Sequence, residues 1–539
     1  MARVAIVESK PNAWASEVLR AVSARQKNEY HLVSPLEIVR QSDGKPETIC
    51  IYVPPFADQE GTTPDLQDAE AVFQQLAELQ SGAVVLISSA LIYGIGPGRQ
   101  AFAKEDYSPP GNGGKRICDQ WDSLEGTARK SLSRNVRLTV LRAATVLPSP
   151  TVFSRWLSHG LVRTMPGHDP CLQFLSLNDL AQAVDCAIEQ RESGIFNVAP
   201  DTAVPLHAAI RMADAHRVAI PRTLQRLTKR SEVLDHFRYS WTVSNEKARE
   251  ELGFVARTSS LATLAEFRGR HLSSDLTFDD FGMDREYIRF YGRTLFRFLS
   301  DFYWRIEDRG LQHVPQEGRA VLVGMHRGFM PWDGVMALHL LVKKTGRYPR
   351  FLTHPALLKF PFLANFMTKL GGVVATQQSA DRVLQANELL GIFPEGIHGA
   401  FTSYKHAYQL QEFGRDAFVK IALRNRAPIV PFVTVGSAEI FPILAKIKSR
   451  FWTRYTEWPC VPLTPTFPLL PIPLPSKWHT QFLPPIHIEK DYPPAAERNR
   501  SVVKAISLEV RTRMQQAVNE MLERRRSIFF GSIFEAEAS

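Results

Sequence analysis

The chain alternates short, continuous apolar runs with amphipathic stretches, and this alternation limits the folds open to it more than any other feature. The apolar runs are RVAIV, TICIYVPP, AVVLISSALIYG and RLTVLRAATVL, all within residues 1–150. Helix-like stretches such as DAEAVFQQLAELQ and QWDSLEGTARKSL separate them. Strands that alternate with helices form parallel sheets covered on both faces. We therefore expect an α/β fold with a doubly wound, Rossmann-like sheet in this half.

The length and the local composition predict two domains. A chain of 539 residues exceeds what one hydrophobic core usually serves. The sequence turns polar and rich in turn-forming residues after about residue 256, and aromatic residues at helical spacing follow. We predict a first domain over residues 1–265, a linker over 266–290 and a second α/β domain over 291–539.

Charge and cysteine content limit the partners and the compartment. The formal net charge is +10, which favours anionic partners such as lipid head groups or phosphorylated donors. The five cysteines are scattered without a C-x-x-C pair, so we expect a reducing compartment and no metal site. The N-terminus lacks a signal-peptide pattern, and apolar runs stay below the roughly 18 residues of a membrane span. We expect a cytoplasmic protein held peripherally at the inner face of a membrane.

Several motifs of the first half occur in the order known from one family. They are ISSALIYG, TVLRAATVL, FLSLNDLAQAV, GIFNVAPD and SNEKAREELGF, spread over roughly 250 residues. In this order they resemble the extended short-chain dehydrogenase/epimerase family. The resemblance implies a dinucleotide-binding fold with a glycine-rich turn after the first strand and a catalytic Tyr-x-x-x-Lys pair.

Both working parts of that family are altered in this chain. The turn after the first strand reads ESKPNAWASE, which contains no glycine to let the backbone close on a pyrophosphate. The best-aligned place for the Tyr-x-x-x-Lys pair holds Trp121 and Glu125, while Ser89 remains. We therefore predict a degenerate domain without NAD(P), whose partner stays unknown.

Four blocks of the second half resemble another family. They are GMHRGFMPWDG, KLGGVVAT, LLGIFPEGIHGAF and APIVPFVTVGSAEIFP. In this order they resemble the glycerolipid acyltransferases, which include 1-acylglycerol-3-phosphate and monoacylglycerol/diacylglycerol acyltransferase-like enzymes. The usual His-x4-Asp pattern is replaced by His-x6-Asp, with His326 and Asp333 at its ends and Pro331 before the Asp.

The resemblance assigns His326 and Asp333 to catalysis. A histidine can take the proton of an acceptor hydroxyl while that hydroxyl attacks a thioester carbonyl. A carboxylate on the other ring nitrogen fixes the tautomer and stabilises the imidazolium. Backbone N–H groups near Gly328 or Gly396 are expected to hold the oxyanion. The reaction needs no metal or cofactor, and acyl-CoA or an acyl carrier protein is the expected donor.

The resemblance also implies a set of substrate-binding residues: Arg327, Gly328, Arg382, Phe393, Pro394, Glu395, Gly396, His398 and Pro431. Family members with phosphorylated acceptors usually carry Arg two residues after the glycine of Phe-Pro-Glu-Gly, where this chain has His398. Arg382 could replace that cation. The acceptor therefore stays open between a lysophospholipid and a neutral glycerolipid or alcohol.

Two other functional classes remain as hypotheses. The chain could be bifunctional, with a first half that still acts as an NAD(P)-dependent epimerase or dehydrogenase. It could also be a non-catalytic sensor of lipids or nucleotides. We expect an acyltransferase with a membrane lipid acceptor and without a nucleic-acid partner.

Overall fold

The computed structural model contains two compact units, Met1–Gly282 and Met283–Ser539. It describes residues 3–534 except 43–47, 80–81, 97–98, 109–115, 159, 221–234, 270–276, 356, 358–359, 361, 415, 457 and 470–471. Within these residues, no helix combines the length and apolarity needed to cross a bilayer.

The first unit is built on a parallel sheet of six strands in the order β10-β5-β4-β3-β1-β2. The strands are β1 (Arg3–Val7), β2 (Glu29–Val33), β3 (Thr48–Tyr52), β4 (Gly82–Ser89), β5 (Val136–Ala143) and β10 (Gly194–Val198). The chain proceeds from β1 to one side and from β3 to the other, so the direction of winding reverses between these two strands. This order confirms the predicted Rossmann-like doubly wound sheet.

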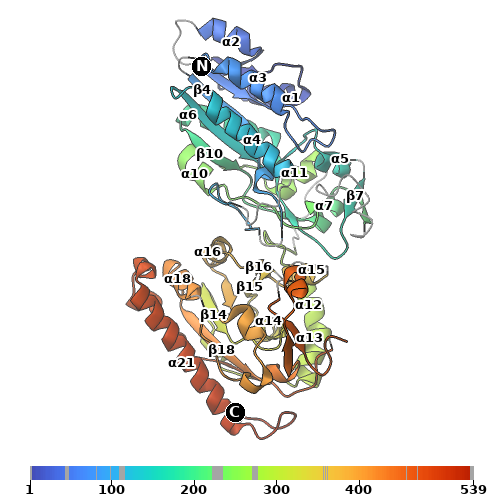
Figure 1. Cartoon of the computed structure of the whole chain (residues 1–539), viewed down its shortest axis with the longest axis vertical. Coiled ribbons are helices and arrows are strands. Elements are labelled where there is room, and N and C mark those ends of the chain that lie inside the picture. The colour runs from blue at the N-terminus through green and yellow to red at the C-terminus, as the bar shows by residue number, and fades with distance from the viewer. Residues whose placement is uncertain are drawn as a thin grey trace. The chain divides into compact units, whose positions relative to one another are not determined.

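Helices cover this sheet in two layers (Figure 1). The helices are α1 (Ala13–Ala24), α2 (Pro35–Ser42), α3 (Leu66–Leu76), α4 (Arg116–Ser131) and α6 (Leu177–Gln190). Helix α1 packs on α6, and α3 packs on α4. Because right-handed crossovers on the two sides of the reversal place helices on opposite faces, the sheet is buried between the layers.

Smaller elements complete the first unit. They are η1 (Ala90–Tyr93), β6 (Thr145–Leu147), α5 (Val152–Ser158), β7 (Leu161–Thr164), β8 (Cys171–Leu172), β9 (Phe174–Ser176), β11 (Val204–Pro205), α7 (Leu206–Met212), β12 (His216–Ala219), α10 (Glu246–Leu252) and α11 (Ser260–Phe267). The short strands pair as β6–β9, β7–β12 and β8–β11.

The second unit is built on a seven-stranded sheet in the order β13-β21-β18-β14-β17-β15-β16. Its strands are β13 (Glu307–Arg309), β14 (Ala320–Gly324), β15 (Arg350–Thr353), β16 (Gly372–Val374), β17 (Leu389–Ile392), β18 (Ile429–Val435) and β21 (His479–Phe482). All neighbours are parallel except β18 and β21. Strands β14 and β18 are buried along their whole length, as central parallel strands require.

Helices and short segments surround this sheet (Figure 1). They are α12 (Arg285–Arg293), α13 (Leu295–Arg297), the π-helical η2 (Phe298–Tyr303), η3 (Leu311–His313), α14 (Trp332–Thr345), α15 (Leu363–Lys369), α16 (Gln377–Gln385), α17 (Gly396–Ala400), η5 (Tyr404–His406), α18 (Ala417–Arg424), η6 (Ser437–Glu439), α19 (Arg450–Thr456), α20 (Ile488–Asp491), η7 (Pro494–Arg498) and α21 (Arg500–Arg524). The strands β19 (Ala445–Ile447) and β20 (Val461–Leu463) form a separate antiparallel pair.

The boundary between the units lies inside the predicted linker over residues 266–290. Helix α12 begins at Arg285, within that segment, because Asp284 caps it by accepting hydrogen bonds from the N–H groups of Glu286 and Tyr287. The second unit therefore begins before residue 291.

Candidate active site

His326 lies in the loop between the central strand β14 and helix α14. The loop makes room for the long His-to-Asp spacing by a turn at Gly328, which has a φ of +64°. Phe329, the next residue, is buried against Phe441 and Phe467, with ring centroids 5.0 and 4.8 Å away. The extra residues thus form a bulge whose Phe329 is buried in the core. The bulge brings His326 and Asp333 back into contact.

Asp333 holds the histidine and its loop with one oxygen. Its Oδ2 lies 3.0 Å from Nδ1 of His326 and accepts a 2.7 Å hydrogen bond from the backbone N–H of Arg327. The Asp333 side chain is fully buried, whereas that of His326 is 15% exposed. A neutral His326 that donates through Nδ1 has Nε2 as its proton acceptor, which is the tautomer that general-base chemistry needs.

Arg327 and Glu395 form a buried ion pair behind this loop. Arg327 Nη1 donates to Glu395 Oε1 at 2.8 Å, and both side chains are at most 1% exposed. The other Arg327 donors reach the carbonyls of His326, Ala407 and Gln409. Glu395 Oε2 accepts the N–H of Gln411 at 2.8 Å. The pair therefore ties the His326 loop to the Phe-Pro-Glu-Gly block and to the chain that follows it.

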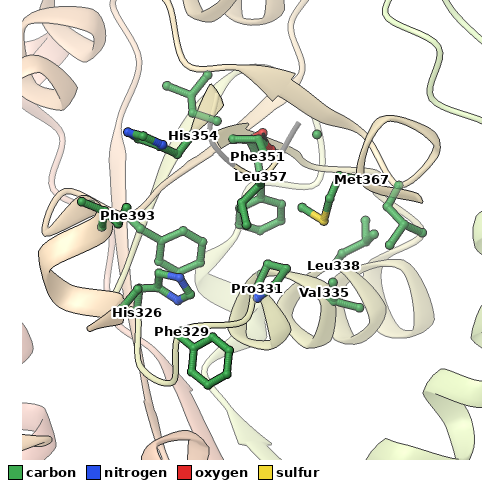
Figure 2. Close-up of a pocket in the computed structure, with 18 of the residues that line it drawn as sticks. His326, Phe329, Pro331, Val335, Leu338, Phe351, His354, Leu357, Met367 and Phe393 are labelled. Atoms are coloured by element: carbon green, nitrogen blue, oxygen red, sulfur yellow. Dashed lines mark hydrogen bonds between the residues drawn. The ribbon is translucent and has the colours of Figure 1, made fainter. Parts of the chain in front are cut away.

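An apolar pocket opens beside the His326 ring (Figure 2). Its empty space is about 880 Å³, a volume that includes open solvent at its mouth. Among the described lining residues, only His326, Thr353, His354 and Trp458 carry polar side-chain atoms. The others are Phe329, Pro331, Gly334, Val335, Leu338, Phe351, Leu352, Leu357, Met367, Leu370, Gly372, Phe393, Gly396, Ile397, Ala400 and Phe401.

The structure places only part of the predicted substrate-binding set at this pocket. Phe393 lies 5.1 Å from the His326 ring and stacks on Phe351, and Gly396 lines the opening. Residues outside the described lining are Arg327, Gly328, Arg382, Pro394, Glu395, His398 and Pro431. Pro431 is buried within β18 opposite Val323, Arg382 lies on α16, and His398 is exposed on α17. Their roles in substrate binding stay predictions.

Most of the pocket wall was not identified from the sequence. Val335 and Leu338 lie one turn apart on α14 after Asp333, so helical spacing could have indicated them. Met367, Leu370 and Trp458 come from distant segments, and only the tertiary fold brings them together.

The crevice of the first unit differs from a dinucleotide site at the N-terminus of α1. There Asn12 accepts the N–H of Trp14 at 3.0 Å, and Glu8 Oε2 accepts the N–H of Asn12 at 3.2 Å. Asn12 also donates to the Val53 carbonyl at the end of β3, which bridges the point where the winding reverses. A carboxylate thus stands where a pyrophosphate would bind, so these residues do not fit NAD(P).

The place of the Tyr-x-x-x-Lys pair holds a polar network centred on Glu125, which also pairs with the half-exposed Arg129. Glu125 is fully buried and accepts hydrogen bonds from Ser88 and Arg142, each at 2.8 Å. Arg142 also donates to the Tyr93 hydroxyl at 2.7 Å. Burial raises the pKa of Tyr93 to about 12, so its hydroxyl stays protonated at neutral pH. Trp121 donates to the Thr62 carbonyl, and Ser89 caps η1.

Three comparisons bear on the class of the protein. The family model described as Acyltransferase matches residues 305–435. An uncharacterized protein of Mycobacterium leprae is 36% identical over 298 residues, which cover 54% of this chain and 79% of that protein. Phytyl ester synthase 1 of Arabidopsis thaliana is 28% identical over 152 residues, covering 26% of this chain and 21% of that protein.

A solved structure also aligns with half of the chain. It is MoeE5 in complex with UDP-glucuronic acid and NAD, with a TM-score of 0.39 and 15% identity, covering 50% of this chain and all of that one. The parallel, doubly wound sheet of the first unit, and not this likeness, supports its description as Rossmann-like.

The fold and the comparisons define a two-unit α/β protein with an acyltransferase domain in its second unit. Residues 305–435 carry the Acyltransferase domain, and the chain belongs to one family with the uncharacterized Mycobacterium leprae protein. This confirms the predicted family of the C-terminal half.

The Arg327–Glu395 pair generates a prediction about stability. Replacing Glu395 with Ala leaves the Arg327 charge buried without its partner, which costs about 3–5 kcal/mol of unfolding free energy. Chemical denaturation of the full chain measures this loss. Asp301→Asn is the control, because it breaks a half-exposed pair with Lys343 and should cost at most about 1 kcal/mol. Equal small losses in both variants would contradict the anchoring role of the buried pair.

The crevice of the first unit generates a second prediction. We expect no saturable binding of NADH or NADPH at low micromolar concentrations, because Glu8 and Asn12 already occupy the α1 N-terminus. Titration of the full chain, followed by cofactor fluorescence, tests this expectation. Tight binding that Glu8→Arg strengthens further would show that the site accepts a pyrophosphate after all.

Proposed function

We propose that the second unit transfers an acyl group from a thioester donor to the hydroxyl group of a lipid acceptor. The observation that supports this most directly is the His326–Asp333 pair at the opening of an apolar pocket. An apolar wall suits an acyl chain, and a histidine with one nitrogen fixed by a buried carboxylate suits proton transfer at the other.

In the proposed reaction, His326 Nε2 accepts the proton of the acceptor hydroxyl. The hydroxyl oxygen forms a bond to the thioester carbonyl carbon, and the bond from that carbon to sulfur breaks. The thiolate leaves and takes the proton from the imidazolium. Asp333 stabilises the charged ring between these two steps and holds its orientation.

Gly328 and Gly396 are proposed to differ in whether their backbone N–H groups can donate to the oxyanion. Gly396 N–H donates to the Phe393 carbonyl at 2.9 Å, so it is engaged within its own turn. The N–H of Gly328 is the better of the two predicted donors to the oxyanion. The donor itself, acyl-CoA or an acyl carrier protein, is anionic and suits the net charge of +10.

An uncharged acceptor fits this pocket better than a phosphorylated one. Recognition of phosphate calls for permanent cations with open donors, usually from arginine. No Lys or Arg belongs to the described lining, and Arg327 has its donors engaged by Glu395 and carbonyl groups. The name of the plant relative describes an ester synthase, which agrees with transfer to an alcohol.

Contact with a membrane is proposed to be peripheral. The segment from α12 to η2 exposes Phe290, Phe298 and Phe302 at 62, 52 and 65%. Arg289, Arg293 and Arg297 are exposed at four-residue spacing along the same segment. Aromatic and basic residues together are typical of helices that lie at a membrane interface.

The other two hypotheses have less support. A bifunctional enzyme would need the cofactor turn and the Tyr-x-x-x-Lys pair, and their places hold Glu8, Asn12 and the Glu125–Arg142 network. A non-catalytic sensor has no need of a histidine held by a buried carboxylate.

Substitution of the catalytic pair tests the proposed chemistry. His326→Ala should lower acyl transfer by at least about 100-fold, since it removes the general base. Asp333→Asn should lower it by about 100-fold or more, because an amide does not stabilise the imidazolium. Initial rates with labelled acyl-CoA and dispersed lipid acceptors measure this. His487→Ala, on a side chain that is 43% exposed, is the control with unchanged rate. Near-normal turnover by His326→Ala on an acceptor used by wild type would exclude His326 as the base.

A matched pair of acceptors tests the acceptor class. Monooleoylglycerol and lysophosphatidate with the same acyl chain differ only in the phosphate. We expect kcat/KM to be at least about tenfold higher for the uncharged lipid. The described lining contains no Lys or Arg to offset the free energy of removing a phosphate from water.

An arginine at position 398 provides the converse test. His398→Arg should raise turnover of lysophosphatidate more than that of monooleoylglycerol. Equal or preferred use of lysophosphatidate by wild type would contradict the acceptor proposal and leave the proposed acyl transfer intact.

A further inference from the structure

A hairpin insert projects from the second unit between β18 and β21. We define this hairpin insert as residues 444–463, which contain β19, α19 and β20. Its two strands pair only with each other, and Leu444 N–H donates to the Leu463 carbonyl at their base. All three residues of β19 are exposed, whereas Trp458 and Cys460, near β20, are buried in the core of the second unit.

The hairpin insert presents large apolar side chains to solvent. Leu444 is 67% exposed, Ile447 is 50% exposed and Phe451 is 80% exposed. Leu469, in the loop that follows β20, is 89% exposed. Single exposed apolar residues are ordinary on a soluble surface, but a group of them on one projecting element marks an interaction site.

The same element is basic. Lys446, Lys448 and Arg450 alternate with the apolar residues and are exposed. Glu457 is the only acidic residue in the sequence from 440 to 482. Apolar side chains beside exposed cations match the chemistry of an anionic lipid surface, where acyl chains lie beneath negative head groups.

The base of the hairpin insert is continuous with the proposed active site. Trp452 on α19 lies 5.9 Å from Trp458, measured between ring centroids. Trp458 lines the pocket and contacts Phe329 and Phe401, at 5.6 and 5.5 Å. Aromatic side chains therefore connect α19 with the pocket.

We propose that the hairpin insert docks the second unit on an anionic lipid bilayer, with Ile447 and Phe451 entering the acyl region and Lys446 and Lys448 contacting head groups. The inference rests on the proposed function, because the acceptor is a membrane lipid only if that function holds. It specifies which surface meets the bilayer and places the pocket opening next to it.

A bilayer fits the insert better than the other occupants of such a surface. A second copy of this chain carries the same positive charge, so two inserts would repel each other. An acidic protein, such as an acyl carrier protein, would complement the lysines, but Phe451 and Leu469 are more than three-quarters exposed and suit insertion between lipids.

Sedimentation with lipid vesicles tests the docking surface on the full chain. The vesicles contain phosphatidylcholine, either alone or with one quarter phosphatidylglycerol. Ile447→Asp/Phe451→Asp should weaken binding to the mixed vesicles at least tenfold, because charged residues do not enter the acyl region. Lys446→Glu/Lys448→Glu should remove the preference for phosphatidylglycerol, with about a fivefold loss per lysine.

Matched controls separate this surface from general effects. Leu508→Asp and Lys504→Glu change an exposed leucine and an exposed lysine on α21 and should bind as wild type does. Phe298→Asp/Phe302→Asp tests the η2 surface in the same assay. Thermal unfolding checks that all variants are folded. Activity with acceptor dispersed in detergent micelles should be unchanged in the insert variants, since none of the four substituted positions belongs to the described lining of the pocket.

Several outcomes would overturn the proposal. It fails if wild type does not bind the mixed vesicles, or if the insert variants bind them as wild type does. It also fails if Phe298→Asp/Phe302→Asp abolishes vesicle binding while the insert variants keep it. A further contradicting result is that the insert variants keep vesicle binding but lose activity with acyl carrier protein as the donor. If wild type shows no acyl transfer to an acceptor dispersed in detergent micelles, the proposed function is contradicted. The vesicle assay does not measure that function, so the two failures are distinguishable.

Discussion

The buried ion pair between Arg327 and Glu395 is the interaction on which the second unit depends most. It connects the loop after β14 to the turn after β17 and to the carbonyls of Ala407 and Gln409. Gly399 lets this pair form, because a Cβ there would lie 2.5 Å from the Glu395 side chain. With Arg327 fixed, its N–H is available to Asp333, and Asp333 in turn orients His326. The candidate base is thus held by a chain of buried contacts.

The two units use buried charge in opposite ways. In the second unit, buried carboxylates hold a histidine that keeps one nitrogen toward a pocket. In the first unit, Glu125 and Arg142 satisfy each other together with Ser88 and Tyr93, and their network has no open proton acceptor comparable to His326. Equally well-packed α/β units can therefore differ in chemistry through the arrangement of a few polar groups.

Much of the fold followed from the sequence, because buried parallel strands are continuous apolar runs. The runs RVAIV and RLTVLRAATVL correspond to β1 and to β5 with β6, and their pattern was sufficient to predict the doubly wound sheet. Only part of the site could be predicted from the sequence. His326 and Asp333 lie in a motif, but Arg327, which was predicted to bind substrate, is buried in an ion pair. Nothing in the local sequence indicates that its partners are carbonyls some 80 positions away. The pocket wall was missed for the same reason, since Met367 and Trp458 meet only in three dimensions.

The Glu125–Arg142 network has a consequence for which substitutions the first unit can accept. A Tyr-x-x-x-Lys pair at this place requires a lysine at position 125, and that lysine would lie beside the buried Arg142 guanidinium. Two like charges side by side in a buried site are unfavourable, so such a lysine would favour a change at Arg142 as well. Trp121 and the Glu8–Asn12 cap would need separate replacements. A Tyr-x-x-x-Lys pair at this place would therefore require several substitutions together, because each residue of the network is held by the others.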